Sequence, residues 1–247
     1  MSTTTSLTNS HEWLQTPLGN YLQMQEQVLF DHAVSDVFGF NALQLGMLEI
    51  DLLRNSRIPY SLKADDDLGA VRCDTSQLPF LSNSIDLVLL PHALDFSTNP
   101  HQTLREAERV LMPEGHIMIS GFNPISAWGL KRITTKQGYP WRGHFLPLLR
   151  IKDWLALLGF ELAGIRMACY TPPFSNPSWL QRFHFMDKTA DRWWPMMGGV
   201  YFIVAKKRVL GMRLIRPNWS KSKLKPGMVP APTQKNDTQK SSMKTKQ

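Results

Sequence analysis

Two short apolar runs in the middle of the chain flank a segment with helical spacing. Ile85–Leu90 is nearly continuously apolar, which is typical of a parallel strand covered on both faces. Asn99 and Pro100 then supply an N-cap and a first helical residue, and apolar residues recur after them at helical spacing. His116–Ser120 has the pattern of a second buried strand. A strand, a crossover helix and a parallel strand form a βαβ unit, whose fixed handedness leaves few α/β topologies.

Three pieces of sequence surround this unit in a fixed order. They are Asp74-x-x-x-Leu78-Pro79-Phe80, then Ser84–Val88, then a helix that we expect to end at Pro113–Gly115. Together they resemble the middle of class I S-adenosylmethionine-dependent methyltransferases, and most of all the small-molecule type 11 group. Each piece alone is weak, but their order is specific. Segments near Trp13 and Trp128 also resemble a bacterial subgroup of these proteins.

The resemblance implies a Rossmann-like, doubly wound α/β fold. Its seven-stranded sheet is mostly parallel, and the last strand is antiparallel. Beyond the central unit, strands are expected at Ala42–Gly46, Arg57–Leu62, Ala70–Cys73, Phe160–Tyr170 and Gly199–Lys206, and helices over Trp13–Phe38 and Leu146–Gly159.

Composition divides the chain into parts. The predicted parts are a disordered N-terminus (1–12), a methyltransferase-like domain (13–209) with an aromatic insertion (171–197), and a disordered basic tail (210–247). The aromatic insertion could contact substrate, a second copy or a membrane surface.

The net charge of +8 is unevenly distributed along the sequence. The sequence has 28 basic and 20 acidic residues. The segment Lys206–Gln247 contains 12 of the basic residues and one of the acidic residues, which leaves 16 basic and 19 acidic residues elsewhere. The folded body is therefore mildly acidic. The tail could attract nucleic acid or an anionic membrane, or could simply keep the protein soluble.

Several features indicate a cytoplasmic protein. The sequence contains no apolar run long enough to span a membrane, and its first residues lack the charged and apolar regions of a secretory signal. Cys73 and Cys169 are too few for a disulfide framework, so we expect two buried thiols.

The turn after the first strand departs from the family pattern. The family has an acid and then several glycines here, which let the backbone approach the cofactor closely. In this chain Gln44 stands in place of the acid, Gly46 is retained, and Leu48 and Ile50 take two later glycine positions. Glu49 could hydrogen-bond a ribose or amino-acid group of the cofactor, or could be a solvated glutamate at the start of a helix.

Two acidic positions match the family's cofactor contacts. Asp65 or Asp66, after the second strand, would accept both ribose hydroxyls, because a carboxylate has two acceptor oxygens. Asp74 would accept from the adenine amino group, with Thr75 beside the ring. The competing interpretations are a charged surface turn for the first pair and an Asx turn for Asp74.

Candidate acceptor-side residues follow the central strands. His92 lies at the carboxyl end of Ile85–Leu90, where open α/β sheets bind ligands, and could act as a base, orient a substrate or pack over the cofactor pocket. Asp95 is a candidate for the same roles. Asn123 and Trp128 lie in a loop that either contacts the acceptor or anchors the chain.

The function implied is transfer of a methyl group from S-adenosyl-L-methionine to an unidentified small-molecule acceptor. This chemistry needs no catalytic triad, since the leaving group is already activated. We find no phosphate loop, dinucleotide turn, nucleophile elbow or metal-ligand spacing, so no metal is expected. The alternative is an inactive methyltransferase-like scaffold whose basic tail contacts nucleic acid or an anionic membrane.

Overall fold

The computed structural model describes most of the N-terminal 208 residues. The described residues are 10–65, 69–135, 138–174 and 196–208, with Ser178, Leu180 and Arg182. The chain divides into a unit Met1–Val209 and a unit Leu210–Gln247. The predicted basic tail and most of the predicted aromatic insertion lie outside the described residues, and so do residues 1–9 of the predicted disordered N-terminus. Residues 10–14 are helical.

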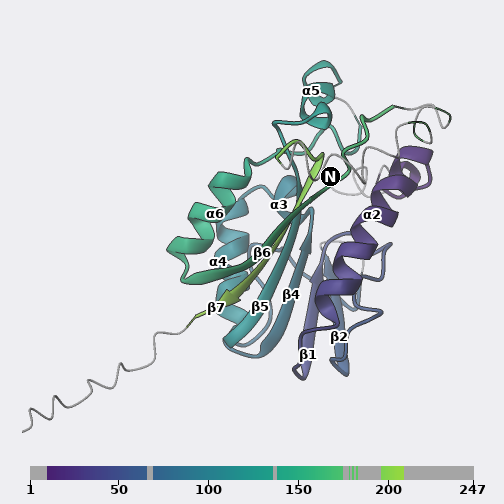
Figure 1. The fold of residues 1–247 in the computed structure, drawn as a ribbon. Coiled ribbons are helices and arrows are strands. Elements are labelled where there is room, and N and C mark those ends of the chain that lie inside the picture. The colour runs from purple at the N-terminus through teal and green to yellow at the C-terminus, as the bar shows by residue number, and fades with distance from the viewer. Residues whose placement is uncertain are drawn as a thin grey trace, which may run out of the picture. The chain divides into compact units, whose positions relative to one another are not determined.

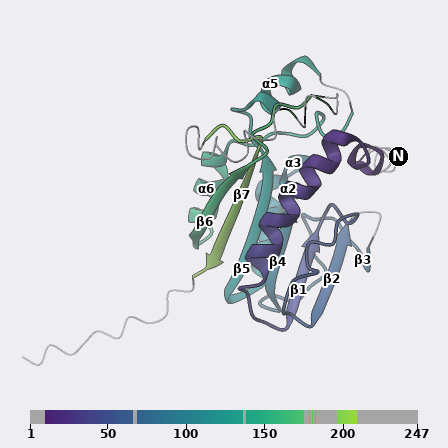
Figure 2. The ribbon, with the colours of Figure 1, turned by 45° about the vertical axis from the view of Figure 1, so that its right-hand side comes forward.

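A seven-stranded sheet forms the centre of the first unit, in the order β3-β2-β1-β4-β5-β7-β6. All neighbouring strands are parallel except β7, which is antiparallel to both β5 and β6. Figure 2 shows this order across the sheet. The predicted doubly wound fold with an antiparallel last strand is therefore confirmed. The strands are β1 (Asn41–Leu45), β2 (Tyr60–Asp65), β3 (Val71–Arg72), β4 (Ile85–Pro91), β5 (Leu111–Phe122), β6 (Phe160–Ala168) and β7 (Val200–Lys207).

The second strand begins later than the predicted Arg57–Leu62. Ile58 is buried in the core, and Pro59 follows it without a backbone N–H to donate to a sheet. Pairing therefore starts at Tyr60, opposite Asn41.

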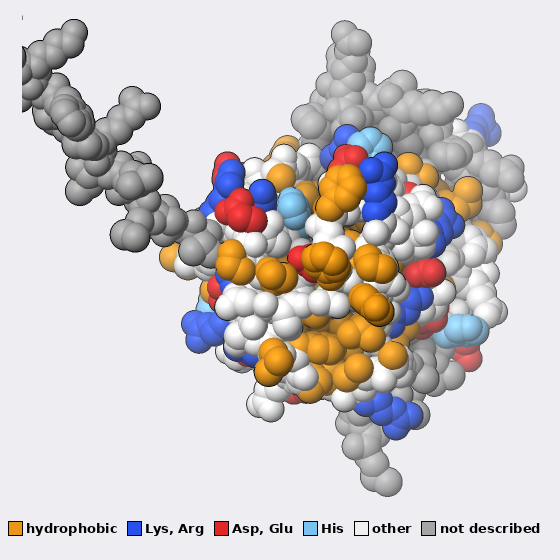
Figure 3. All heavy atoms as spheres, turned by 90° about the horizontal axis from the view of Figure 1, so that it is seen from below, with side chains coloured by type: hydrophobic (Ala, Val, Ile, Leu, Met, Phe, Trp, Pro, Cys, Tyr) orange, Lys and Arg blue, Asp and Glu red, His pale blue; other side chains and the backbone are white. Residues whose placement is uncertain are grey.

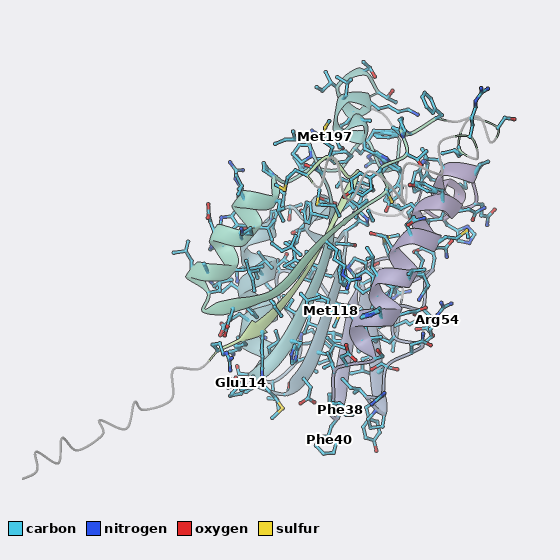
Figure 4. The ribbon with its side chains drawn as sticks, viewed as in Figure 1. Phe38, Phe40, Arg54, Glu114, Met118 and Met197 are labelled. Carbon is cyan, nitrogen blue, oxygen red and sulfur yellow. The ribbon has the colours of Figure 1, made fainter. Side chains whose placement is uncertain are left out.

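One long helix covers the first face of the sheet. Helix α2 (Pro17–Val34) has Thr16 as its N-cap, whose side chain accepts a hydrogen bond from the Gly19 N–H. Phe30 and Val34 of α2 pack with alternate strand residues, among them Ala42, Leu87, Leu89, Met118 and Phe202. Figures 1 and 4 show α2 along this face, with Met118 labelled beside it.

Helices α4 (Pro100–Val110) and α6 (Leu148–Leu157) cover the opposite face (Figure 1). The remaining strand positions point to them, as the two-residue period of a strand requires. Their cluster includes Leu43, Val88, Leu90, Ile117 and Ile119 from the sheet and Leu104, Ala107, Ile151 and Leu155 from the helices. Asn99 caps α4 as predicted, since its side chain accepts from the Gln102 N–H.

Helix α4 ends earlier than the predicted Pro113–Gly115. Pro113 disfavours helical backbone at the residue before it, and the chain is already extended at Leu111. Leu111 pairs with Ile85 of β4, so β5 starts directly after the helix.

The segment after β5 is partly helical, contrary to the expected loop. Helix α5 (Ala127–Thr134) is capped by Ser126, whose hydroxyl accepts from the Gly129 N–H. A short helix, α3 (Ala93–Phe96), also follows β4, where the sequence predicted none. None of the described helices is long and apolar enough to cross a membrane.

Exposed apolar side chains gather at the amino end of the sheet, seen from below in Figure 3. Phe38 and Phe40, which precede β1, are 71% and 73% exposed, and the Arg57 guanidinium lies over the Phe38 ring. Figure 4 labels both phenylalanines at this end. The apolar surface is thus at the end of the sheet opposite to the carboxyl ends of its parallel strands.

A prediction follows from the packing of α5. The Gly129→Ala substitution should lower the free energy of unfolding by about 2–4 kcal/mol, because a Cβ there would lie 2.0 Å from the Pro124 carbonyl oxygen. Gly164→Ala is the matched control, since no atom lies within 4 Å of its Cβ position. Urea unfolding of both variants checks this, and equal midpoints would contradict the tight packing of α5.

Candidate active site

The carboxyl ends of four strands bring predicted residues to one edge of the sheet. Gly46 follows β1, Asp65 ends β2, Asp74 follows β3 and His92 follows β4. Because these strands are parallel neighbours, their carboxyl ends share one edge, where open α/β sheets bind ligands.

Gly46 retains the geometry for which the family uses glycine. Its φ is +84°, and a Cβ there would lie 3.4 Å from the Pro91 carbonyl oxygen and 3.6 Å from the Ala93 Cβ. Its N–H donates to the Ala64 carbonyl of β2. The backbone at the end of β1 therefore sits between the ends of β2 and β4.

The turn after Gly46 is held by the side chain of Gln44. Its amide nitrogen donates to the Gly46, Met47 and Ile50 carbonyl oxygens at 3.3, 3.1 and 2.9 Å. Its amide oxygen accepts from the Leu52 N–H. Gln44 is fully buried, so one side chain bonds four backbone groups of the turn, of which the Met47 carbonyl also accepts from the Ile50 N–H.

The residues at the two lost glycine positions have different surroundings. Ile50 is 2% exposed and belongs to the apolar cluster on the α2 side of the sheet. Leu48 is half-buried and lines a pocket of about 450 Å³ with Asp51, Lys63 and Gly69. Ile50 thus lies in the core, whereas Leu48 lies against β2 and the residues that precede β3.

The predicted cofactor acids differ in their surroundings. Asp74 is exposed, and its Oδ1 accepts from the Ser76 N–H at 2.7 Å, which is an Asx turn. Thr75 is half-buried, with its hydroxyl 3.5 Å from that of Thr103. Asp65 ends β2, whereas Asp66 lies outside the described residues. Their predicted contacts with the cofactor stay predictions.

His92 is the centre of a buried ionic cluster. Its Nε2 lies 2.7 Å from Glu26 Oε1 of α2, and its Nδ1 lies 2.8 Å from Asp95 Oδ2 of α3. All three side chains are fully buried, and the His92 ring stacks on Phe122 at 3.9 Å. Both ring nitrogens are therefore occupied, which leaves His92 to hold the two carboxylates in place.

The ionic cluster places two carboxyl groups around one imidazole ring. Burial lowers the pKa of His92, but the charges of and hydrogen bonds to Glu26 and Asp95 outweigh burial and raise it to about 9. The pKa of Asp95 is raised, because burial outweighs the opposing hydrogen bond and charge of His92. Asp95 Oδ2 also accepts from the Phe122 N–H, which favours the ionised form.

Several oxygens near the ionic cluster are buried without a hydrogen-bond partner. Among the described residues they include Glu26 Oε2, Asp95 Oδ1 and the hydroxyls of Tyr139 and Tyr201. Burial raises the pKa of Tyr139, and the charges of Glu26, Glu49 and Asp95 raise it further. Tyr201 is affected in the same way by burial and by Asp95.

Asn123 and Trp128 bond within the chain. The Asn123 amide donates to the Met196 and Gly198 carbonyl oxygens and accepts from the Ile125 N–H. The Trp128 ring is fully buried, and its Nε1 donates to the Thr171 carbonyl. These contacts anchor the segment after β5; the predicted contact with an acceptor stays a prediction.

Two residues of this site were missed by the sequence interpretation. Glu26 falls within the apolar stripe of α2, and an acid at such a position indicates a buried partner, which was the available signal. Tyr139 lies in a polar turn that carries no periodic pattern, so the sequence gave no signal for it.

Comparison with known proteins gives a family for this chain. Residues 43–119 match a family model described as a methyltransferase domain. YafS of Escherichia coli (strain K12), an uncharacterized protein, is 30% identical over 216 residues, which cover 85% of this chain and 86% of YafS. The malonyl-[acyl-carrier protein] O-methyltransferase of Methylovorus sp. (strain MP688) is 30% identical over 120 residues, which cover 48% of this chain and 40% of that protein.

Solved structures agree with this family at the level of the fold. One is a methyltransferase of Thermotoga maritima described as a possible histamine N-methyltransferase, with a TM-score of 0.56, 14% identity and coverage of 82% of this chain and 96% of that one. Another is a putative methyltransferase of Bacillus halodurans C-125, with a TM-score of 0.52 and 14% identity. The match covers 74% of this chain and 99% of that one. The chain belongs to the type 11 group of class I S-adenosylmethionine-dependent methyltransferases. YafS is a relative over most of the length of both chains.

The role of Gln44 predicts the effect of restoring an acid. Gln44→Glu should lower the free energy of unfolding by roughly 3 kcal/mol, since a buried carboxylate would face the three carbonyl oxygens that the amide now bonds. Gln77→Glu, at an exposed glutamine, is the control and should change little. Urea unfolding measures both; an unchanged Gln44→Glu variant would show that the side chain does not hold the turn.

The ionic cluster predicts a pH dependence of stability. A folded pKa raised from 6.5 to about 9 gives His92 a stabilising contribution that is complete below 6.5 and is lost as pH rises through about 9. Its size is roughly 3 kcal/mol. Urea unfolding across this window should show a falling free energy of unfolding. His92→Asn should remove this slope, because asparagine does not titrate, and asparagine also tolerates the positive φ of 51° at this position. A wild-type curve without slope in this window would contradict the charged cluster.

Proposed function

We propose that this protein transfers a methyl group from S-adenosyl-L-methionine to a small-molecule acceptor. The observation that carries the proposal is the turn after β1. Gly46 keeps a positive φ at the carboxyl edge, while Gln44 braces the turn and Ile50 points into the core. The loss of glycine at position 50 therefore does not place a bulky side chain at this edge.

The residues at the carboxyl edge fit the cofactor that the family uses. Gly46 offers backbone without a side chain, Asp65 or Asp66 offers paired acceptors for ribose hydroxyls, and Asp74 with Thr75 would lie at the adenine. When bound, S-adenosylmethionine supplies a methyl group on a sulfonium that is already a good leaving group.

The protein's own contribution would be positioning and exclusion of water. Helix α2 covers the face of the sheet beside the strand ends and is tied to it through Glu26 and His92. Ser10 also donates to Glu49 in the turn after β1, so the start of the described chain contacts the same turn. A covered edge suits methyl transfer, because removal of water strengthens electrostatic interactions with the reacting groups.

Relatives support the class of reaction and leave the acceptor open. The Methylovorus protein is a methyltransferase, but this chain matches less than half of its length, so only methyl transfer as a class is carried over. The expectation that the basic tail contacts nucleic acid or an anionic membrane concerns residues outside the described ones, and it stays a proposal.

Calorimetric titration tests the proposed cofactor. Wild-type protein should bind S-adenosylmethionine and S-adenosylhomocysteine with micromolar affinity, about −8 kcal/mol. Asp74→Ala should weaken binding roughly tenfold or more, because it removes a carboxylate acceptor from the proposed adenine contact.

Asp153→Ala is the matched control, since Asp153 is an exposed acid on α6, away from the strand ends. It should bind both ligands as the wild type does. Absence of heat with wild-type protein at high ligand concentration, together with an unshifted melting temperature, would reject the enzyme and favour an inactive methyltransferase-like scaffold.

A further inference from the structure

Helix α5 exposes its apolar side chains and turns its basic ones inward. Leu130 and Ile133 are 65% and 68% exposed, whereas Lys131 and Arg132 are half-buried. Each basic group lies over an aromatic ring of the segment after α5, at 5.2 Å from the centre of the ring. A helix whose outer face meets only water has the reverse pattern, with its charged residues outside. The outer face of α5 is therefore suited to contact with a partner.

Exposed apolar side chains beside α5 extend this face. Ile125, just before α5, is 72% exposed, and Met196 and Met197, just before β7, are 58% and 52% exposed. The Asn123 amide donates to the Met196 carbonyl oxygen at 2.9 Å, which joins the two segments. Figures 1 and 4 show α5 and Met197 at the same end of the molecule. We call these five residues the α5 surface: Ile125, Leu130, Ile133, Met196 and Met197.

The sequence around the α5 surface carries positive charge without negative charge. No Asp or Glu occurs from Gly115 to Lys152, whereas six basic residues do: Lys131, Arg132, Lys136, Arg142, Arg150 and Lys152. Asp65, which ends β2, and Asp74, which follows β3, lie across β1 and β4 from β5 in the strand order. The α5 surface therefore combines exposed apolar side chains with a positively charged surrounding sequence.

The order of these groups matches the layers of a membrane surface. Lys131 donates to the Pro173 carbonyl oxygen and Arg132 lies over Phe145, so both cations sit behind the outward apolar side chains. Elements that bind a bilayer surface place apolar side chains at the boundary of headgroups and acyl chains, and keep Lys and Arg at the headgroups. Anionic headgroups attract each such cation.

We propose that the α5 surface binds an anionic phospholipid bilayer. Leu130 and Ile133 enter the boundary between headgroups and acyl chains, and the basic residues behind them face lipid phosphates. A second copy of the chain fits less well, because a symmetric contact would bring the same cations together without an acid from these segments. Nucleic acid also fits less well, since bases stack on aromatic rings and this surface exposes aliphatic and thioether side chains. The proposal does not depend on methyl transfer.

Co-sedimentation of the full-length protein with lipid vesicles tests this proposal. The wild type should bind vesicles of phosphatidylglycerol and phosphatidylcholine in equal amounts more tightly than vesicles of phosphatidylcholine alone. The double variant Leu130→Ser with Ile133→Ser should bind the mixed vesicles roughly tenfold to a hundredfold more weakly, because two apolar side chains no longer enter the bilayer. Its melting temperature should stay close to that of the wild type, since both side chains are exposed.

A matched pair of exposed apolar residues on α2 supplies the control. Met24 and Val28 are each 68% exposed. The double variant Met24→Ser with Val28→Ser should bind the mixed vesicles as the wild type does. The predicted basic tail is present in every variant, so binding through the charge of the tail alone would leave the two double variants equal.

The contribution of charge is tested at Arg142, an exposed residue next to Trp141. Arg142→Gln should weaken binding to the mixed vesicles roughly fivefold, because one cation near the headgroups is lost. Arg105→Gln, at an exposed arginine of α4, is the control and should bind as the wild type does.

Three results would overturn the proposal. They are equal binding of the two double variants to the mixed vesicles, no preference of the wild type for phosphatidylglycerol, and no binding of the wild type to either kind of vesicle. With the third result, a wild-type dimer in light scattering that is lost in Leu130→Ser with Ile133→Ser would assign the α5 surface to a second copy. None of these results bears on the proposed methyl transfer, because the α5 surface contains none of the proposed cofactor residues.

Discussion

The burial of three ionisable side chains is the constraint on which this end of the molecule depends. Glu26, His92 and Asp95 are each fully enclosed, and removal of His92 would leave two acidic side chains buried without a positive partner. They come from α2, from the end of β4 and from α3, so their pairing joins the N-terminal helix to the centre of the sheet. The docking of α2 is therefore specified by charge as well as by the apolar contacts of Phe30 and Val34.

Gln44 of the neighbouring strand, β1, also bonds buried polar groups, in this case those of the backbone. Residues 46–59, all of which the structure describes, form turns where a helix commonly follows the first strand of a doubly wound sheet. A turn-rich segment buried against a sheet needs partners for its backbone groups, and the Gln44 amide supplies four. An aspartate would offer only acceptors here. The glutamine that departs from the family pattern is thus matched to the turn that follows it.

The sequence predicted most of the fold because its signals were local. Asn99 and Pro100 mark the start of α4 through capping, and Ile85–Leu90 marks β4 through its apolar run. The site was less predictable because its contacts join distant residues: Glu26 and His92 are 66 positions apart. The substitution of Ile50 for glycine suggested an obstructed cofactor turn, whereas the backbone takes a different course and buries Ile50 in the core. Only the fold shows which interpretation of such a residue applies.

The two ends of the parallel strands differ in the polarity of their side chains. The amino end exposes apolar rings such as Phe38 and Phe40 and contains none of the predicted cofactor residues. The carboxyl end collects acids and polar backbone, and α2 brings a further acid, Glu26, to it. The helix that covers the face beside the first strand is thus also joined to the carboxyl end of the sheet through one buried ion pair, so its apolar packing and its charge pairing fix the same position.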